Sequence, residues 1–235
     1  MTSIKSAVAL AVMAAMGTVA HAEQIAYGGI ATGYGETVDI EWDSWGGVDQ
    51  TKAGLMTLKG STGTALYEAF CVELAQYTST SLKTYTSSTF TGPAGTNLTK
   101  LFSSSFGSVD TAREYAAFQV AIWEITHEFE ANSFSVTPPG AGQDFNIAGG
   151  QHDGAKTSED AAVRDLANGY LLAATHYSGV ATYSLTKLSH NSYQDFVTWE
   201  YTGGDQPSVP EPSTVSLMLA GLGIAGIAAR RRRQD

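Results

Sequence analysis

The sequence predicts an α+β fold, a mostly antiparallel β-sheet or barrel with two helices packed on it. The order of the segments supports this: short runs of strand character, one stripe at helical spacing, a long loop, a second helix and two closing strands. Ser, Thr, Gly and Tyr are abundant while Lys and Arg are scarce, which is typical of a secreted β-rich domain.

Strands are predicted wherever alternating or apolar runs are bounded by turn residues such as Gly46 and Gly47. The first runs are residues 25–30, 37–42, 53–58 and 65–74, a further strand lies near 82–86, and the closing strands lie near 182–188 and 193–201.

The first helix is predicted from Asp110 or Thr111, either of which can cap it, to Glu130. Apolar side chains at helical spacing predict its buried face. They are Tyr115, Phe118, Ile122, Ile125 and Phe129. Val120 and Glu124 lie off this stripe and are expected to be more exposed, with Trp123 partly buried between the two faces.

A loop containing two prolines and several glycines is predicted from residue 133 to residue 156. The second helix is predicted from Thr157 or Ser158 to His176, because Glu159 and Asp160 stand in its first turn, where acidic residues favour a helix start.

The C-terminal 27 residues form a three-part signal. Pro210 and Pro212 hold Glu211 in extended backbone, a mostly apolar run follows from residue 215 to 229, and a basic cluster closes the chain. That cluster is Arg230, Arg231, Arg232 and Arg233. The apolar run predicts a short transmembrane helix, and the arginines keep its end on the cytoplasmic side.

These three features resemble, in order, the PEP-CTERM sorting tail of exopolysaccharide-producing Gram-negative bacteria. The resemblance implies that an exosortase cuts the chain near Glu211, that the tail anchors the protein in the inner membrane only transiently, and that the product is a cell-surface or extracellular protein of the exopolysaccharide matrix or biofilm. An ordinary C-terminal membrane anchor is the alternative.

The N-terminus has the form of a secretory signal peptide. Lys5 precedes an apolar run over residues 7–16, and Ala20 and Ala22 form the small-x-small pattern that signal peptidase cuts. The expected organisation is therefore a signal peptide over 1–22, one secreted domain over 23–202, a linker over 203–208 and the sorting tail over 209–235.

The expected mature chain, residues 23–211, is strongly acidic. Of the 13 basic and 23 acidic residues of the whole chain, 8 basic and 22 acidic residues remain, which gives a net charge of −14. Such a surface disfavours binding to nucleic acids and to anionic lipids.

Cys71 is the single cysteine of the chain and lies in a predicted strand. It is a buried structural thiol, an intermolecular bridge or a modified group. The segments Ala69-Phe-Cys-Val-Glu73 and Ala117-Phe-Gln-Val-Ala-Ile-Trp123 resemble the thioester domains of Gram-positive surface adhesins. In that family a cysteine of an aromatic-Cys-apolar-acidic strand bonds to the glutamine of a Thr-Gln-x-Ala motif.

That resemblance implies that Cys71 is the thiol partner and Gln119 the acyl partner of an internal thioester, with Phe118 where the family usually has Thr or Ser and Glu73 as the acidic residue. Transfer of the acyl group to a surface amine or hydroxyl would then attach the protein covalently.

Other candidate sites are less specific. Oxygen-bearing residues of the long loop could hold Ca²⁺, although their spacing is not that of an EF-hand. They are Asp144, Asn146 and Asp153. No other cofactor is expected. Alternating acids at Asp39, Glu41 and Asp43 fit either a carboxylate pair or a soluble edge strand. The histidines have no metal-ligand spacing, and His127 is expected on a solvated face.

Several aromatic residues fit either a core or a platform on which sugars stack: Tyr34, Trp42, Trp45, Tyr67, Tyr85 and Trp199.

Three classes of function follow. The first is a secreted matrix or surface protein that anchors itself through a thioester. The second is a non-covalent carbohydrate-binding module, which needs exposed aromatics around a groove. The third is a glycosidase, which needs two carboxylates that face one cleft. The expected protein is not an enzyme beyond a single turnover of acyl transfer.

Overall fold

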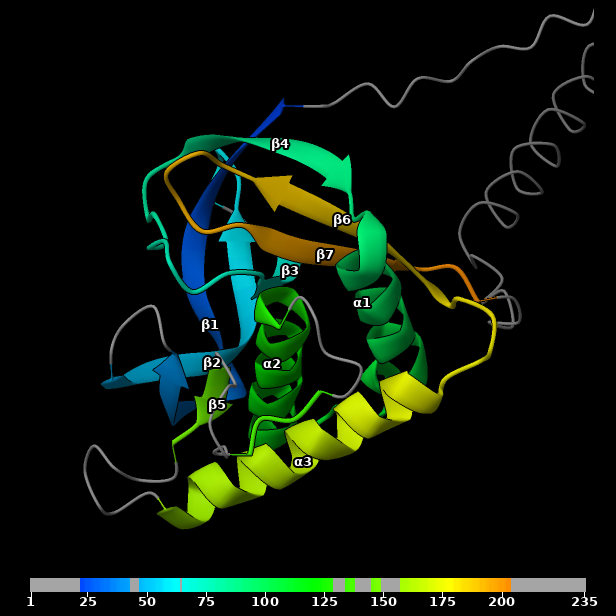
Figure 1. The fold of residues 1–235 in the computed structure, drawn as a ribbon. Helices are drawn as coiled ribbons and strands as arrows, with labels where there is room; N and C mark the ends of the chain where they lie inside the picture. Colours follow the sequence, from blue (N-terminus) through cyan, green and yellow to red (C-terminus); the bar gives the residue numbers. More distant parts are fainter. Residues whose placement is uncertain are drawn as a thin grey trace, which may run out of the picture.

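The computed structural model describes residues 22–42, 47–63, 65–128, 134–137, 145–148 and 157–203 (Figure 1). The strands are β1 Ala22–Trp42, β2 Gly47–Lys59, β3 Ala65–Cys71, β4 Lys83–Thr89, β5 Phe145–Ile147, β6 Tyr183–Ser189 and β7 Phe196–Tyr201. The helices are α1 Gly92–Ser105, the short 3₁₀ helix η2 Phe106–Ser108, α2 Ala112–His127 and α3 Thr157–His176.

The strands form one seven-stranded sheet in the order β2-β3-β7-β6-β4-β1-β5, and β2 also pairs with β1. Every pairing is antiparallel, which confirms the predicted sheet. The additional pairing is possible because β1 is long: residues 22–25 pair with β4, whereas residues 26–42 pair with β2.

The two strands predicted over residues 25–30 and 37–42 are therefore one strand. Glycines between them permit irregular backbone without ending the ladder, since the β1–β2 register shifts between Tyr27 and Ile30 and again between Ile30 and Gly35. Gly29 and Gly33 adopt φ values of 104° and 82° inside this stretch, a region that other residues rarely adopt.

The described residues of the domain contain three α-helices, where the sequence predicted two. The additional helix, α1, follows residues 76–91, which are rich in Ser and Thr, and has a proline in its first turn. Its buried positions follow helical spacing. The sequence did not predict this helix because the surrounding serines and threonines are typical of a loop. The buried positions are Gly95, Leu98, Leu101, Phe102 and Ser105.

The predicted start of α2 is confirmed. Thr111 is its N-cap, and Thr111 and Glu114 form a capping box in which each side chain bonds to the backbone of the other residue. The predicted exposed face is wrong: Val120 and Glu124 are buried, and Trp123 is more buried than expected. Phe129 lies outside the described residues.

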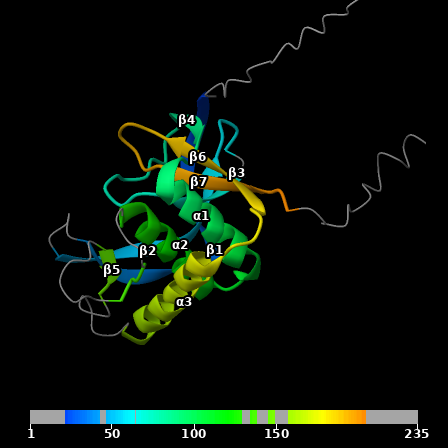
Figure 2. The ribbon, with the colours of Figure 1, turned by 45° about the vertical axis from the view of Figure 1, so that its right-hand side comes forward.

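The burial of α2 on all sides follows from its neighbours. The helix packs on β1, β2 and β3, and it also contacts α1 and α3, so that it lies between the sheet and the other two helices (Figures 1 and 2). A stripe of apolar residues indicates which face meets the first layer, but it does not show that a second layer covers the opposite face.

The second predicted helix is confirmed as α3, which packs on α1 and α2. Within the predicted loop between α2 and α3 the structure places β5, whose Ile147 pairs with Ile40 of β1.

The predicted signal peptide, linker and sorting tail lie almost wholly outside the described residues, apart from Ala22 and the first part of the linker. Among the described helices, none is both long enough and apolar enough to cross a membrane.

The burial of Glu124 changes the ionisation of its carboxyl group. Burial raises the pKa of its carboxyl to about 8; the Ser135 N–H, which donates to it over 2.7 Å, opposes this, and the nearby Glu128 adds to it. The second oxygen of Glu124, Oε2, has no hydrogen-bond partner among the described residues.

We predict that stability falls as pH rises from about 4.5 to about 8, because the folded state keeps the Glu124 proton over a range in which the unfolded chain loses it. In the Glu124→Gln variant, the loss of unfolding free energy between these two pH values should be smaller by about 3 to 5 kcal/mol. The variant should therefore melt at a higher temperature than the wild type at pH 8 and at a similar temperature at pH 4. Exposed Glu200→Gln serves as the control, and an unchanged pH profile for Glu124→Gln would contradict the prediction.

Candidate functional site

Cys71 lies at the end of β3, at a point where one side of the strand loses its partner. On one side, Phe70 and Cys71 pair with Val197 and Phe196 of β7. On the other side, the pairing with β2 runs only as far as Ala69. The backbone N–H and C=O of Cys71 are buried and need partners from elsewhere.

Gln119 of α2 supplies both partners. Its side-chain Oε1 accepts a hydrogen bond from the Cys71 N–H over 2.8 Å, and its Nε2 donates to the Cys71 carbonyl over 2.9 Å. Gln119 is 0% exposed and Cys71 is 1% exposed. The carboxamide thus takes the place of a neighbouring strand, and the structure brings together the two residues that the sequence selected.

The thiol of Cys71 lies in apolar surroundings, with its Sγ 3.2 Å from the Sδ of Met56 on β2. Burial raises the pKa of the Cys71 thiol well above its ordinary value, and the negative charge of Glu73 adds to this effect. The group is therefore a neutral thiol rather than a thiolate at physiological pH.

This arrangement has the groups that acyl transfer needs. The Gln119 carboxamide carbon is the electrophile. The nucleophile is the thiol of Cys71, the residue whose backbone this carboxamide contacts. When a nucleophile adds to the carbonyl, negative charge develops on Oε1, the atom that already accepts the Cys71 N–H. Nε2 is the leaving nitrogen.

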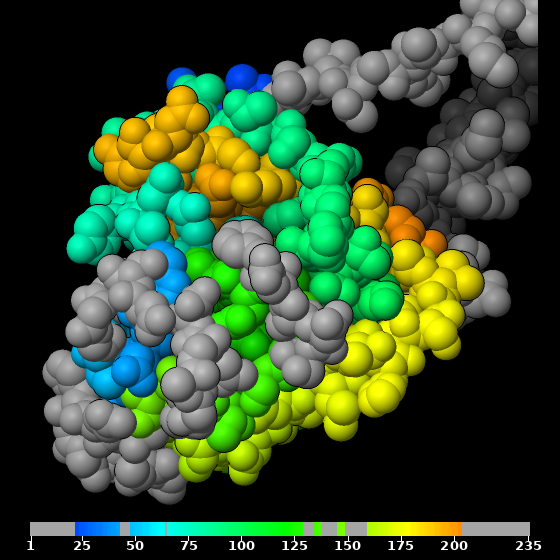
Figure 3. All heavy atoms as spheres, viewed as in Figure 1, coloured from blue at the N-terminus to red at the C-terminus, as the bar shows by residue number. Residues whose placement is uncertain are grey.

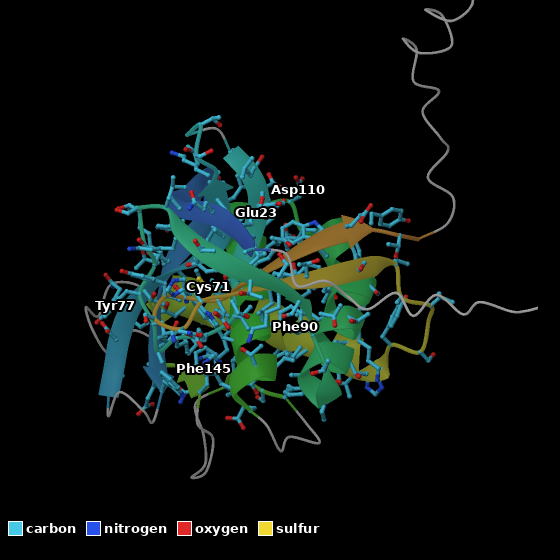
Figure 4. The ribbon with its side chains drawn as sticks, turned by 90° about the horizontal axis from the view of Figure 1, so that it is seen from above. Glu23, Cys71, Tyr77, Phe90, Asp110 and Phe145 are labelled. Atoms are coloured by element: carbon cyan, nitrogen blue, oxygen red, sulfur yellow. The ribbon has the colours of Figure 1, made fainter. Side chains whose placement is uncertain are left out.

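A cavity of about 660 Å³ lies beside the pair and has Cys71 in its wall. Residues 49–52 of β2 form one part of the wall, residues 74–78 after β3 form another, and Trp123 and Gln194 complete it together with Tyr27 and Met56. In Figure 3 the blue-green segment that follows β3 lies above the blue strand β2 on the left of the molecule. Figure 4 shows Cys71 toward the middle of the fold and Tyr77 at its periphery.

Phe118, which precedes Gln119, helps to hold the helix in place. It is fully buried and packs against Phe70, with ring centroids 5.3 Å apart, and against Phe102 at 5.0 Å. Phe70 directly precedes Cys71, just as Phe118 directly precedes Gln119. The contact between these two rings therefore lies beside the pair.

The alternating acids of β1 do not behave as an exposed edge. Asp39 is buried, its N–H is bonded to Asp160 Oδ1 over 3.2 Å, and its Oδ1 accepts from Gln50 Nε2 at the same distance. The interpretation of Asp39 as an edge-strand solubility residue is therefore wrong. Asp43 lies outside the described residues.

The expected solvated position of His127 is also wrong. The ring packs edge-on against Trp42 with centroids 5.1 Å apart, and burial lowers the pKa of the imidazole. Within the described part of the chain, no group of three metal-ligating side chains comes together. Asn146, of the calcium hypothesis, is buried in β5, whereas Asp144 and Asp153 lie outside the described residues.

The aromatic residues considered for sugar stacking are dispersed. Tyr85 is buried, and Trp199 packs against Phe106 with centroids 4.6 Å apart. Trp45 lies outside the described residues. The aromatic residues that do line the cavity beside Cys71 are Tyr27, Tyr77 and Trp123.

Two contributors to the site were missed from the sequence. Met56, which contacts the sulfur, lies in a predicted strand, but nothing in its spacing indicates its partner. The segment after Cys71, which includes Gln76 and Tyr77, has no regular periodicity that would place it beside β2.

Comparison with known proteins identifies the tail. Residues 208–233 match the family model of the PEP-CTERM protein-sorting motif. The chain carries a PEP-CTERM sorting signal. This signal implies an exported surface protein, anchored transiently at the membrane, with exosortase as its processing partner. No curated protein sequence matches the chain.

Two solved structures from Streptococcus pyogenes are similar to the chain. The N-terminal domain of the pilus tip adhesin Cpa has a TM-score of 0.39 and 13% identity, covering 64% of this chain and 85% of its own. The N-terminal thioester domain of the fibronectin-binding protein SfbI has a TM-score of 0.37 and 14% identity, covering 64% of this chain and 87% of its own. The chemistry of the site rests on the contacts between Cys71 and Gln119.

We predict that Gln119→Leu is less stable than Cys71→Ala by about 1 to 4 kcal/mol. Neither variant can form a bond between these two side chains, but Gln119→Leu leaves two buried backbone groups of Cys71 without partners, whereas Cys71→Ala keeps both hydrogen bonds, which involve only the backbone of residue 71. Urea unfolding of the two variants measures the difference, and equal stabilities would contradict the pairing.

Proposed function

We propose that the exported domain attaches itself covalently to an extracellular partner through an internal thioester between Cys71 and Gln119. The observation that carries the proposal is the bidentate contact between the Gln119 carboxamide and the Cys71 backbone in a fully buried setting. Contact in the folded state supplies the high effective concentration that an otherwise slow acyl transfer requires.

The bond forms by exchange at the Gln119 side chain. The Cys71 sulfur adds to the carboxamide carbon and gives a tetrahedral intermediate whose oxyanion accepts the Cys71 N–H. The carbon–nitrogen bond then breaks, and Nε2 leaves as ammonia with the proton of the thiol. The product is a thioester between Sγ and the former carboxamide carbon.

The second step transfers the acyl group to the partner. An amine or hydroxyl reaches the thioester through the cavity beside Cys71 and attacks the same carbon. The carbon–sulfur bond breaks, the sulfur takes the proton that the nucleophile loses, and an amide or ester remains. Because Gln119 is consumed, each molecule reacts once.

A non-covalent carbohydrate-binding role is the second candidate, since Tyr77 is exposed at the cavity. A glycosidase has less support. Glycoside hydrolysis uses two carboxylic groups on one cleft, and the described wall of the cavity contains one, that of Asp49.

For sorting, we predict cleavage close to Glu211 and release of the domain from the membrane. Peptide mapping of the extracellular form should recover peptides up to the linker and none from residues 217–233. Recovery of the complete tail from released protein would overturn this prediction.

For the thioester, the purified domain should weigh one ammonia less than its sequence and should gain one methylamine per molecule on treatment. Cys71→Ala and Gln119→Ala should abolish both mass changes, because each removes one partner of the bond. Gln24→Ala, which removes an exposed glutamine outside the cavity, is the matched control and should leave both changes intact. A full-length mass together with a thiol that titrates in the native protein would leave a structural cysteine instead.

A further inference from the structure

The described wall of the cavity beside Cys71 combines apolar side chains, among them Met56 and Leu74, with polar side chains that carry almost no net charge. Its lining residues include one acid, Asp49, and one base, Lys52, so their formal charges cancel. The other polar groups are amides and hydroxyls, and raised pKa values keep the Cys71 thiol and the Tyr27 phenol neutral. This neutrality contrasts with the net charge of −10 of the whole chain.

Two residues of the wall each have a buried side-chain atom with no hydrogen-bond partner among the described residues. These atoms are the Trp123 indole Nε1 and the Gln76 side-chain Oε1. The indole N–H can only donate, whereas the amide oxygen can only accept. An unpaired donor and an unpaired acceptor on the wall of one cavity fit a ligand group that does both, as a hydroxyl does.

Tyr77 adds an aromatic surface at the rim of the cavity. Its side chain is 89% exposed, although its backbone is held in place by the N–H of Gln194, which donates to the Tyr77 carbonyl over 3.2 Å. A large apolar ring held in water beside a polar cavity is typical of a surface that binds a ligand.

From these observations we propose that this cavity binds a neutral, hydroxyl-rich chain, an uncharged oligosaccharide, with one sugar ring stacked on Tyr77 and hydroxyls that reach Trp123 Nε1 and Gln76 Oε1. The cavity, at about 660 Å³, lies in the size range of small-molecule sites. The idea that the bound oligosaccharide accepts the acyl group of the thioester rests on the proposed function. The binding of the oligosaccharide in the cavity does not.

Charged ligands fit the cavity less well. An ammonium group needs a carboxylate when it leaves water, and the charge of Asp49, the one acid of the described lining, is balanced by that of Lys52. An anionic polymer would meet a cavity in which Lys52 is balanced by Asp49, on a domain of net negative charge.

The test separates binding from covalent chemistry by means of Cys71→Ala, which cannot form a thioester. Neutral cello- and chito-oligosaccharides are titrated into this variant by calorimetry and NMR, with oligolysine and polygalacturonate fragments as charged comparisons. At least one neutral probe should bind with a Kd below about 10 mM. Adding Tyr77→Ala should weaken that binding by about tenfold.

A second variant and a control test whether the probe binds in this cavity. Trp123→Phe keeps a large ring but removes the indole N–H, and it should also weaken binding of the neutral probe. Tyr201→Ala removes another exposed aromatic that does not line the cavity, and it should leave the affinity unchanged. Three results would overturn the proposal. They are no binding of any neutral probe, binding of the charged probes alone, and an affinity for the neutral probe that is unchanged in the Tyr77→Ala variant. Each of these results is independent of whether the wild type forms a thioester.

Discussion

The site depends on one interaction, the pairing of a side-chain carboxamide with the end of a β-strand. A carboxamide has a donor and an acceptor, as a peptide group does, so Gln119 completes the ladder where β2 no longer pairs with β3. The pairing also fixes the rotation of α2. A turn by one residue, about 100°, would bring Phe118 or Val120 to the Cys71 backbone and leave two buried groups unpaired.

The burial that creates this contact has opposite effects on the two stages of the proposed chemistry. It raises the pKa of the Cys71 thiol, so little thiolate is present to attack the carboxamide. It also excludes water, which would otherwise hydrolyse a thioester once formed. Formation therefore relies on the long-lived contact between Cys71 and Gln119 rather than on an activated nucleophile, and a slow first step is acceptable for a bond that reacts once.

The sequence predicted the elements well where local signals exist. The Thr111–Glu114 capping box, the spacing in α2 and the start of α3 are local patterns, and the antiparallel sheet follows from turns between short strands. It did not predict the burial of Glu124, because that depends on the segment after α2, whose Ser135 N–H returns to the Glu124 carboxyl without any local pattern that indicates it. The pair Cys71 and Gln119 came from family resemblance, and no periodicity indicates that positions 48 residues apart share a hydrogen bond.

If the proposed thioester forms, the sorting tail and the buried pair are related through timing. A group that reacts once has to remain unreacted until its partner is present, so both access and location matter. Location is set by the tail, which implies release only after processing at the membrane. Access is set by the fold: Cys71 is 1% exposed, and the proposed approach to it is a cavity whose formal charges cancel. A partner that occupies this cavity gains residence time beside the carboxamide carbon, whereas a small solute meets it only in passing. Selectivity then arises from binding in the cavity rather than from the intrinsic reactivity of the bond.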